Sequence, residues 1–161
     1  MKTLTLTQPW ATLVAIGAKK FETRSWKTFY RGPLAIHAAK GFPKWAQELC
    51  FQEPFQPALG DHIKGLTSNT LILPKLLPTG CIVATCELTA IYPTLTEKGT
   101  SEGVRRIDPN GFIMPPDEPE LSFGDYSPDR FAWVLENIQP LAEPIPAKGS
   151  LSLWEWEQSH D

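Results

Sequence analysis

The chain has 161 residues, of which 16 are proline and 6 are tryptophan, and its formal net charge at pH 7 is −3. A chain of this length buries one hydrophobic core and leaves little material for a second, so we expect one domain over residues 1–161. The proline content is about twice the usual ~5%, which excludes a helix bundle or coiled coil. The net charge, taken alone, argues against a nucleic-acid partner.

The first half of the chain predicts three strands and two helices. Alternating polar and apolar residues predict strands over 2–6, 20–24 and 33–39. We expect Thr7 to cap a helix that ends at Gly17, and a second helix over 43–52 that begins at Pro43. Residues 53–79 contain four prolines and are expected to be less regular.

The second half predicts three more strands, over 80–91, 130–141 and 150–157. Residues 93–128 are rich in proline and acidic side chains, and we expect them to form a long ordered loop or excursion. About six strands with a few short helices indicate a mainly β fold with α: a small β-barrel of about six strands with short flanking helices.

Cysteine and histidine usage predicts neither disulfides nor a metal site. The three cysteines include no CxxC pair, and Cys81 and Cys86, five residues apart in one strand, are expected to face opposite sides. The three histidines are scattered without ligand spacing, so we expect no metal and no cofactor. No apolar run reaches the length of a membrane span, and we expect a cytoplasmic protein that does not bind a membrane.

Charge is distributed unevenly along the chain. Residues 1–44 hold eight Lys/Arg and one acidic residue, a net of +7, and the remainder carries −10. Aromatic residues such as Trp26 and Tyr30 are interleaved with these cations, a composition typical of a surface that binds nucleic acid. The alternative is a solvated basic face balanced by the acidic half of the same molecule.

Several motifs in order carry a resemblance to a known family. They are Gln8-Pro9-Trp10-Ala11, Gly17-x-Lys19-x-x-Glu22-x-Arg24-Ser25-Trp26, Arg31-Gly32-Pro33-Leu34-Ala35-Ile36-His37-Ala38-Ala39-Lys40, Phe123-Gly124-Asp125-Tyr126-Ser127-Pro128 and Pro144-Ile145-Pro146-x-Lys148-Gly149. In these the chain resembles the ASCH domain (activating signal cointegrator homology) of the PUA-like superfamily, in its stand-alone bacterial form. The resemblance implies a PUA-like barrel with a cleft between barrel and helix that holds RNA or a modified nucleobase.

The second motif contains the central candidate site. In an extended strand Glu22 and Arg24 share one face, and Lys19 precedes them at the corner between helix and strand. A Lys–Glu–Arg cluster can position phosphates and base edges, or perform acid–base chemistry on an amide. The alternative is an ordinary salt bridge.

Further side chains are predicted to contact the ligand. Trp26 is a candidate stacking platform, His37 can donate or accept a hydrogen bond beside small neighbours, and Tyr126 can stack on a base. Packing inside the protein is the alternative for each of them. The remaining candidates, most of them cations suited to phosphates, are Ser25, Lys27, Arg31, Lys40, Arg130 and Lys148.

An enzymatic alternative rests on Glu87, a lone carboxylate in the strand over 80–91. The chain also resembles compact bacterial ASCH amidohydrolases, which remove the acetyl group from acetylated cytidine with a Lys, a Thr and a Glu. Matching motifs place these at Lys19, Glu22 and Glu87, so the Thr nucleophile is replaced by Glu22, which could act only as a general base. We therefore predict a module that binds RNA or single-stranded nucleic acid, or a nucleoside-like small molecule. A hydrolase or nuclease and a protein-interaction module are the alternatives.

Overall fold

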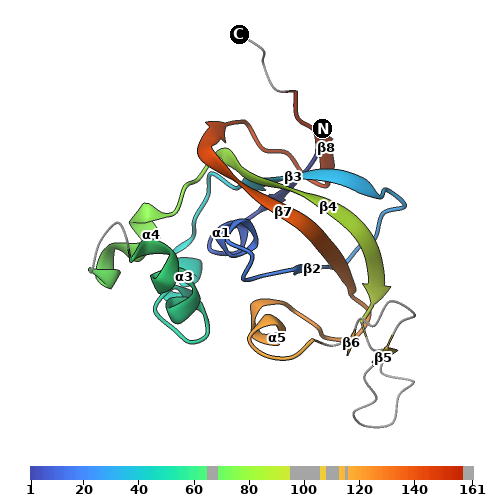
Figure 1. Cartoon of the computed structure of the whole chain (residues 1–161), viewed down its shortest axis with the longest axis horizontal. Helices are drawn as coiled ribbons and strands as arrows, with labels where there is room; N and C mark the ends of the chain where they lie inside the picture. Colours follow the sequence, from blue (N-terminus) through green and yellow to red (C-terminus); the bar gives the residue numbers. More distant parts are fainter. Residues whose placement is uncertain (65–68, 95–105, 108–112, 115, 158–161) are drawn as a thin grey trace.

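The computed structural model describes residues 1–64, 69–94, 106–107, 113–114 and 116–157. In this part of the chain the principal element is a six-stranded mixed sheet in the order β2-β7-β4-β3-β1-β8 (Figure 1). Its strands are β1 (Lys2–Leu6), β2 (Phe21–Arg24), β3 (Gly32–Ala38), β4 (Cys81–Pro93), β7 (Phe131–Pro146) and β8 (Leu153–Glu155). All neighbours are antiparallel except β1 and β3.

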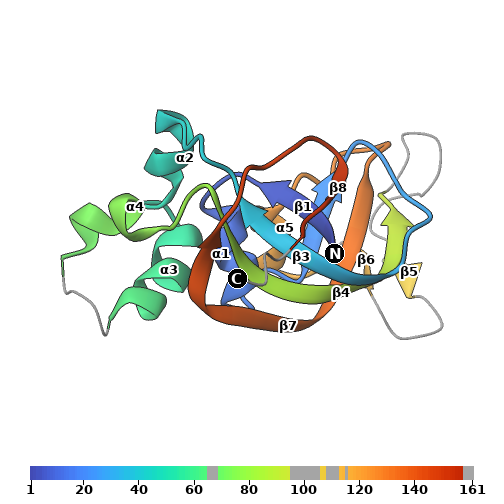
Figure 2. The same ribbon diagram turned by 90° about the horizontal axis from the view of Figure 1, so that it is seen from above.

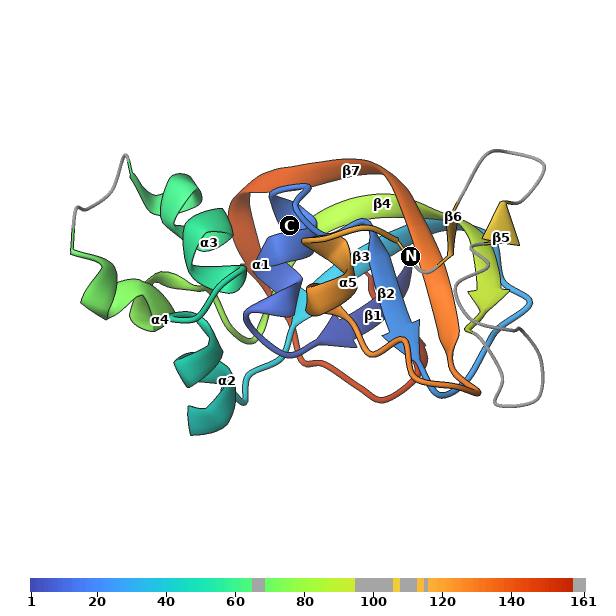
Figure 3. The ribbon, with the colours of Figure 1, turned by 90° about the horizontal axis from the view of Figure 1, so that it is seen from below.

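The sheet curls into a half-barrel. The two longest strands, β4 and β7, pair along most of their length and change register at three places, and such bulges bend a strand and increase its twist. Helix α1 (Trp10–Ala15) lies against the concave face of the sheet, where it contacts β3, β4 and β7 (Figure 3). The edge strands β2 and β8 leave the half-barrel open on one side.

Helices gather at one end of the half-barrel (Figure 2). They are α2 (Lys44–Leu49), α3 (Phe55–Ile63), the 3-10 helix η1 (Thr70–Ile72) and α4 (Leu73–Leu76); α5 (Glu120–Phe123) lies close to α1. Because Val14 faces the core inside the sheet and Leu13 faces a second apolar cluster with α3 and α4, α1 joins the two. A separate two-stranded sheet pairs β5 (Arg106–Ile107) with β6 (Ile113–Met114).

The predicted fold class is confirmed: the protein is mainly β with α, and each of the six predicted strands forms. The strand ends differ, since β7 continues to Pro146 and β8 covers only 153–155. The helix predicted over 43–52 is shorter and follows Pro43 directly.

Two predictions about helices were wrong. The N-cap of α1 is Pro9, not Thr7, and Oε1 of the buried Gln8 accepts the N–H of Thr12, 3.0 Å away, in place of a capping hydroxyl. The stretch 53–79, predicted to be less regular, contains α3, η1 and α4. Prolines are tolerated there because they lie at or near helix starts, as Pro54 does before α3.

Of the predicted excursion over 93–128, residues 95–105, 108–112 and 115 lie outside the described residues. Its last part, from 116 onward, is ordered around α5 and packs against β2 and α1. In the described residues no helix is long and apolar enough to cross a membrane.

Candidate functional site

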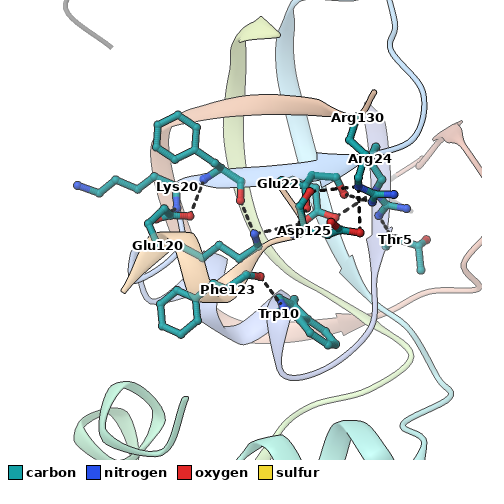
Figure 4. A network of polar contacts seen from close by, with 12 residues as sticks. Thr5, Trp10, Lys20, Glu22, Arg24, Glu120, Phe123, Asp125 and Arg130 are labelled. Carbon is teal, nitrogen blue, oxygen red and sulfur yellow. Dashed lines mark hydrogen bonds and ion pairs between the residues drawn. The ribbon is translucent and has the colours of Figure 1, made fainter. Parts of the chain in front are cut away.

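A cavity of about 360 Å³ lies between the start of α1, strand β2 and the loop after α5. Figure 4 shows the polar network around it. Its charged members come from β2 and the preceding turn on one side and from the loop on the other. The residues that line it are Trp10, Lys19, Glu22, Thr23, Leu49, Phe55, Ser122, Phe123, Gly124 and Asp125.

Lys19 is the most buried charge in the cavity, with 1% of its surface exposed. Its ammonium donates to the backbone oxygen of Phe21, and Nζ lies 3.7 Å from Oε2 of Glu22. That separation allows an ion pair but is too long for a hydrogen bond. Among the described residues Lys19 therefore has one hydrogen-bond acceptor for three N–H donors.

Glu22 is shared between two cations. Its Oε1 lies 3.0 Å from Nε of Arg24, and its side chain is only 11% exposed. The Nε–H of Arg24 is not aligned with this oxygen and has no hydrogen-bond partner elsewhere in the described chain. The three residues predicted as a Lys–Glu–Arg cluster thus meet in the folded chain, with hydrogen-bonding capacity left on both cations.

The loop after α5 forms the opposite wall. Nε1 of Trp10 donates to the backbone oxygen of Phe123 at 2.7 Å, and the backbone N–H of Asp125 donates to Oγ1 of Thr23 at 2.9 Å. Arg130 pairs with the Asp125 carboxylate, 3.3 Å from Oδ2. Residues about a hundred positions apart in the sequence are thereby fixed on two sides of one cavity.

Two further groups shape the electrostatics of this region. Glu120 accepts the backbone N–H groups of Lys20 and Phe21 at 2.9 and 3.1 Å, and burial raises the pKa of its carboxyl. The hydroxyl of Tyr126 is buried and has no hydrogen-bond partner among the described atoms. Burial, then the negative charges of Glu120 and Glu22, raise the pKa of Tyr126, so it stays a neutral donor.

A second and larger cavity, of about 890 Å³, collects three other predicted residues: His37, Lys40 and Lys148. The His37 ring is buried, and its Nε2–H donates to the backbone oxygen of Ala147, 3.0 Å away. Burial lowers the pKa of His37, so the ring is neutral at pH 7. The cavity is lined by Thr5, His37, Ala39, Lys40, Thr79, Gly80, Pro146, Ala147, Lys148, Gly149, Ser150 and Leu151.

Thr5 joins the two parts of the site. Its backbone oxygen accepts a 2.8 Å hydrogen bond from Nη2 of Arg24, and its hydroxyl lies 3.2 Å from Nδ1 of His37. Nε1 of Trp154 also donates to this hydroxyl at 3.1 Å. The Lys–Glu–Arg cluster and the second cavity are therefore adjacent, because Thr5 contacts Arg24 of the first and His37 of the second.

Four predicted residues lie apart from both cavities, on the segment that follows β2. Ser25 and Lys27 are exposed, and Arg31 donates to backbone oxygens of its own loop. Trp26, predicted as a stacking platform, packs at 85° against Trp133 with ring centroids 4.8 Å apart. This edge contact is the packing alternative that the sequence left open.

Glu87 does not join the Lys19 cluster. It is exposed on β4, where its Oε2 accepts a 3.1 Å hydrogen bond from Asn137 on β7. Strict alternation placed it on one face with Val83, which is buried. Val83 lies at a register shift against β3, but from Ala84 onward alternation holds. Glu87 therefore shares the outward face with Thr85 and Thr89, while Cys86 and Leu88 on either side of it are buried.

The cysteines offer no nucleophile in this structure. All three thiols are free and buried, and burial raises the pKa of Cys50 to about 11 and that of Cys86 to about 12. Cys81 and Cys86, expected on opposite faces, both lie in the core cluster, because Val83 is an extra residue of β4 against β3 and reverses the alternation between them. Across the described residues no group of three His, Cys, Asp or Glu side chains is placed to hold a metal ion.

Sequence reasoning missed several residues of the site. The residues not predicted for the site are Trp10, Thr23, Asp125 and Glu120. Trp10 and Asp125 lie within the motifs of the family resemblance, which was the available signal. Nothing in the local sequence distinguishes Glu120, whose partners are backbone groups of residues 20 and 21.

Comparisons with known proteins agree with these motifs. A family model described as "ASCH domain" matches residues 4–145. "Activating signal cointegrator 1" of Homo sapiens is 28% identical over 153 residues, and the protein of the same name from Mus musculus is 26% identical over 151 residues. Each match covers 94% of this chain and 21% of the relative, so the chain spans about a fifth of the length of these relatives.

Proposed function

The chain belongs to the ASCH domain family, a PUA-like family linked to RNA binding, and from that premise we propose that it binds single-stranded RNA through a nucleobase held in the Lys19 cavity. The phosphates beside that base would lie along the second cavity, near Lys40 and Lys148. The observation that carries the proposal is the state of Lys19: an almost fully buried ammonium whose donors are mostly unused.

A buried ammonium is costly unless it is paired and hydrogen-bonded. Glu22 supplies a charge at 3.7 Å, and Phe21 supplies one backbone acceptor. The remaining donors of Lys19 require an acceptor from outside the protein, or water. A base carbonyl oxygen that enters the cavity would meet this requirement.

Glu22 adds the complementary half of the recognition. An ionised carboxylate only accepts hydrogen bonds. Glu22 therefore favours a ligand in which an N–H group lies close to the carbonyl oxygen that Lys19 binds. The edges of nucleobases present such adjacent donors and acceptors, and unstacked single-stranded bases expose them. A cavity of about 360 Å³ is at the small end of ligand sites and fits one base.

The second cavity supplies attraction for phosphates. Lys40 and Lys148 are both exposed, and no acidic residue is among the described residues that line this cavity. The Lys19 cavity, in contrast, contains the carboxylates of Glu22 and Asp125. The uncompensated cations therefore favour phosphates in the second cavity and a neutral base in the first.

Fluorescence anisotropy with labelled single-stranded RNA tests the proposal. Lys19→Met keeps the bulk of the side chain and removes its donors, and we expect at least about tenfold weaker binding because hydrogen bonds to charged groups are lost. Lys20→Met is the matched control: it removes the same charge from the adjacent exposed position. Equal losses in both variants, or no binding by the unaltered protein, would overturn the proposal.

A second candidate function is hydrolysis of an acylated nucleoside. It is favoured by one observation: the Glu22 carboxylate, the Lys19 ammonium and the Thr23 hydroxyl line one cavity. Glu22 would take a proton from water as the water oxygen attacks the acetyl carbonyl, and Lys19 would stabilise the oxyanion. The C–N bond would then break as Glu22 returns that proton to the amine nitrogen, which releases acetate and the free amine. Acetylated cytidine and labelled RNA are incubated with the protein and with Glu22→Gln. Turnover no greater than that of the variant excludes this function, and intact RNA excludes a nuclease.

A further inference from the structure

Trp45, the second residue of α2, is an exposed aromatic residue beside the Lys19 cavity. Its surface is 58% exposed, and its ring centroid lies 5.9 Å from that of Trp10 at an interplanar angle of 49°. Trp10 itself lines the cavity. The two indoles together present an aromatic surface that extends from solvent to the cavity wall, and an aromatic side chain exposed in this way can stack on a base.

Two contacts hold Trp10, the inner indole of the pair, in place. Trp10 is held by the 2.7 Å hydrogen bond from its Nε1 to Phe123 and by an edge contact with Phe55 at 6.0 Å. Leu49 lies one helical turn after Trp45, on the same face of α2, and Leu49 lines the cavity. Trp45 thus adjoins two residues that line the cavity without lining it itself.

The segment that leads to Trp45 also connects the two cavities. Lys40 lines the second cavity, and Lys44, next to Trp45, is exposed. Two lysines, Lys40 and Lys44, therefore lie on the segment that leads from the second cavity to the indole of Trp45. A nucleic-acid strand that followed these two lysines would bring the neighbour of the bound base over Trp45.

We propose that Trp45 stacks on the nucleobase that flanks the one in the Lys19 cavity, so that the protein recognises at least two consecutive nucleotides. This inference rests on the proposed RNA binding and adds a ligand subsite to it. Base–aromatic stacking tolerates any base, because every base presents a π-face. Trp45 therefore contributes affinity for a strand over a single nucleoside, with little preference among flanking bases.

The test compares Trp45→Ala and Trp45→Phe on labelled RNA oligonucleotides and on oligonucleotides with one abasic position scanned along the strand. Trp45→Ala is expected to weaken binding to intact RNA by about fivefold or more, and Trp45→Phe to retain most of the affinity. With the flanking base removed, the Trp45→Ala loss should fall below about twofold. Phe51→Ala, which truncates another exposed aromatic residue outside both cavities, is the control.

Competition by free nucleosides separates the two proposals. Lys19→Met should weaken both nucleoside and RNA binding, whereas Trp45→Ala should weaken only RNA binding. If Lys19→Met weakens RNA binding and Trp45→Ala does not, the stacking role is overturned and the proposed function stands. The stacking role is also overturned if Trp45→Ala weakens binding to intact and to abasic RNA equally. It is overturned likewise if Trp45→Ala weakens the binding of a protein partner and not the binding of RNA. If the unaltered protein binds no RNA, both proposals fall.

Discussion

Nη2 of Arg24, at the end of β2, donates a 2.8 Å hydrogen bond to the backbone oxygen of Thr5 in β1. These strands are not neighbours in the sheet: β7, β4 and β3 lie between them in the strand order. The bond spans the open side of the half-barrel, beside the ion pair of Arg24 with Glu22. Arg24 therefore serves the fold and the candidate site at once.

Arg24→Gln is expected to lower the free energy of unfolding by about 1–3 kcal/mol, because a backbone acceptor loses its donor and Glu22 loses its nearest cation. Urea denaturation of the two proteins measures the change. Arg31→Gln is the control, since Arg31 is exposed and, among the described residues, donates only to backbone oxygens of its own loop; its cost should stay below about 0.5 kcal/mol. Equal costs would contradict the structural role of Arg24.

The salt dependence of RNA binding should report the phosphate contacts of the second cavity. Replacing Lys40 and Lys148 together by Ala is expected to make the slope of log K against log salt shallower by about 1.4, because each single-strand phosphate contact contributes about 0.7. Lys64→Ala with Lys75→Ala removes the same charge from exposed positions outside both cavities and should leave the slope unchanged. An unchanged slope in the Lys40 and Lys148 double variant would show that phosphates do not bind in that cavity.

His37 predicts how stability depends on pH. Burial lowers its pKa in the folded protein, so below about pH 6.5 the unfolded chain binds more protons and is favoured. The contribution of the neutral His37 ring to the free energy of unfolding is complete above about pH 6.5 and is lost as the pH falls toward the lowered pKa. Between pH 7.5 and 5.5, His37→Gln should lose less unfolding free energy than the unaltered protein. His62→Gln, at an exposed position, should behave like the unaltered protein; identical losses in all three would contradict the prediction.

Two glycine substitutions should have opposite signs. A Cβ on Gly149 would lie 2.5 Å from Cε1 of His37, so Gly149→Ala should destabilise the protein by about 1–3 kcal/mol. Gly60 lies inside α3 with nothing within 4 Å of its Cβ position, so Gly60→Ala should stabilise by about 0.5–1 kcal/mol. Thermal and urea unfolding measure both changes. A tolerated Gly149→Ala would mean that the 147–151 segment does not pack on His37 as described.

Much of the fold was predictable because its determinants are local. The alternation of residues 2–6 and 33–39 predicts β1 and β3, and Gly17, in the left-handed region at φ 76°, follows the end of α1 as expected. The uneven charge was also visible: the net charge of −3, which taken alone argues against nucleic acid, averages a basic N-terminal block with an acidic remainder. The same block supplied the motif that contains Lys19, Glu22 and Arg24.

The tertiary structure decided which of these residues meet. Alternation placed Glu87 on one face with Thr85 and Thr89 but could not say whether that face is interior. The packing of Cys86 and Leu88 in the core turns it outward. Nor could alternation place Thr23 beside Asp125, or Trp45 beside Trp10, since these contacts depend on how distant segments dock. The sequence by itself thus determined the elements and the chemistry available to the site. Packing around α1 determined that Lys19 is buried with N–H donors that have no acceptor among the described residues, which is the feature that points to a ligand.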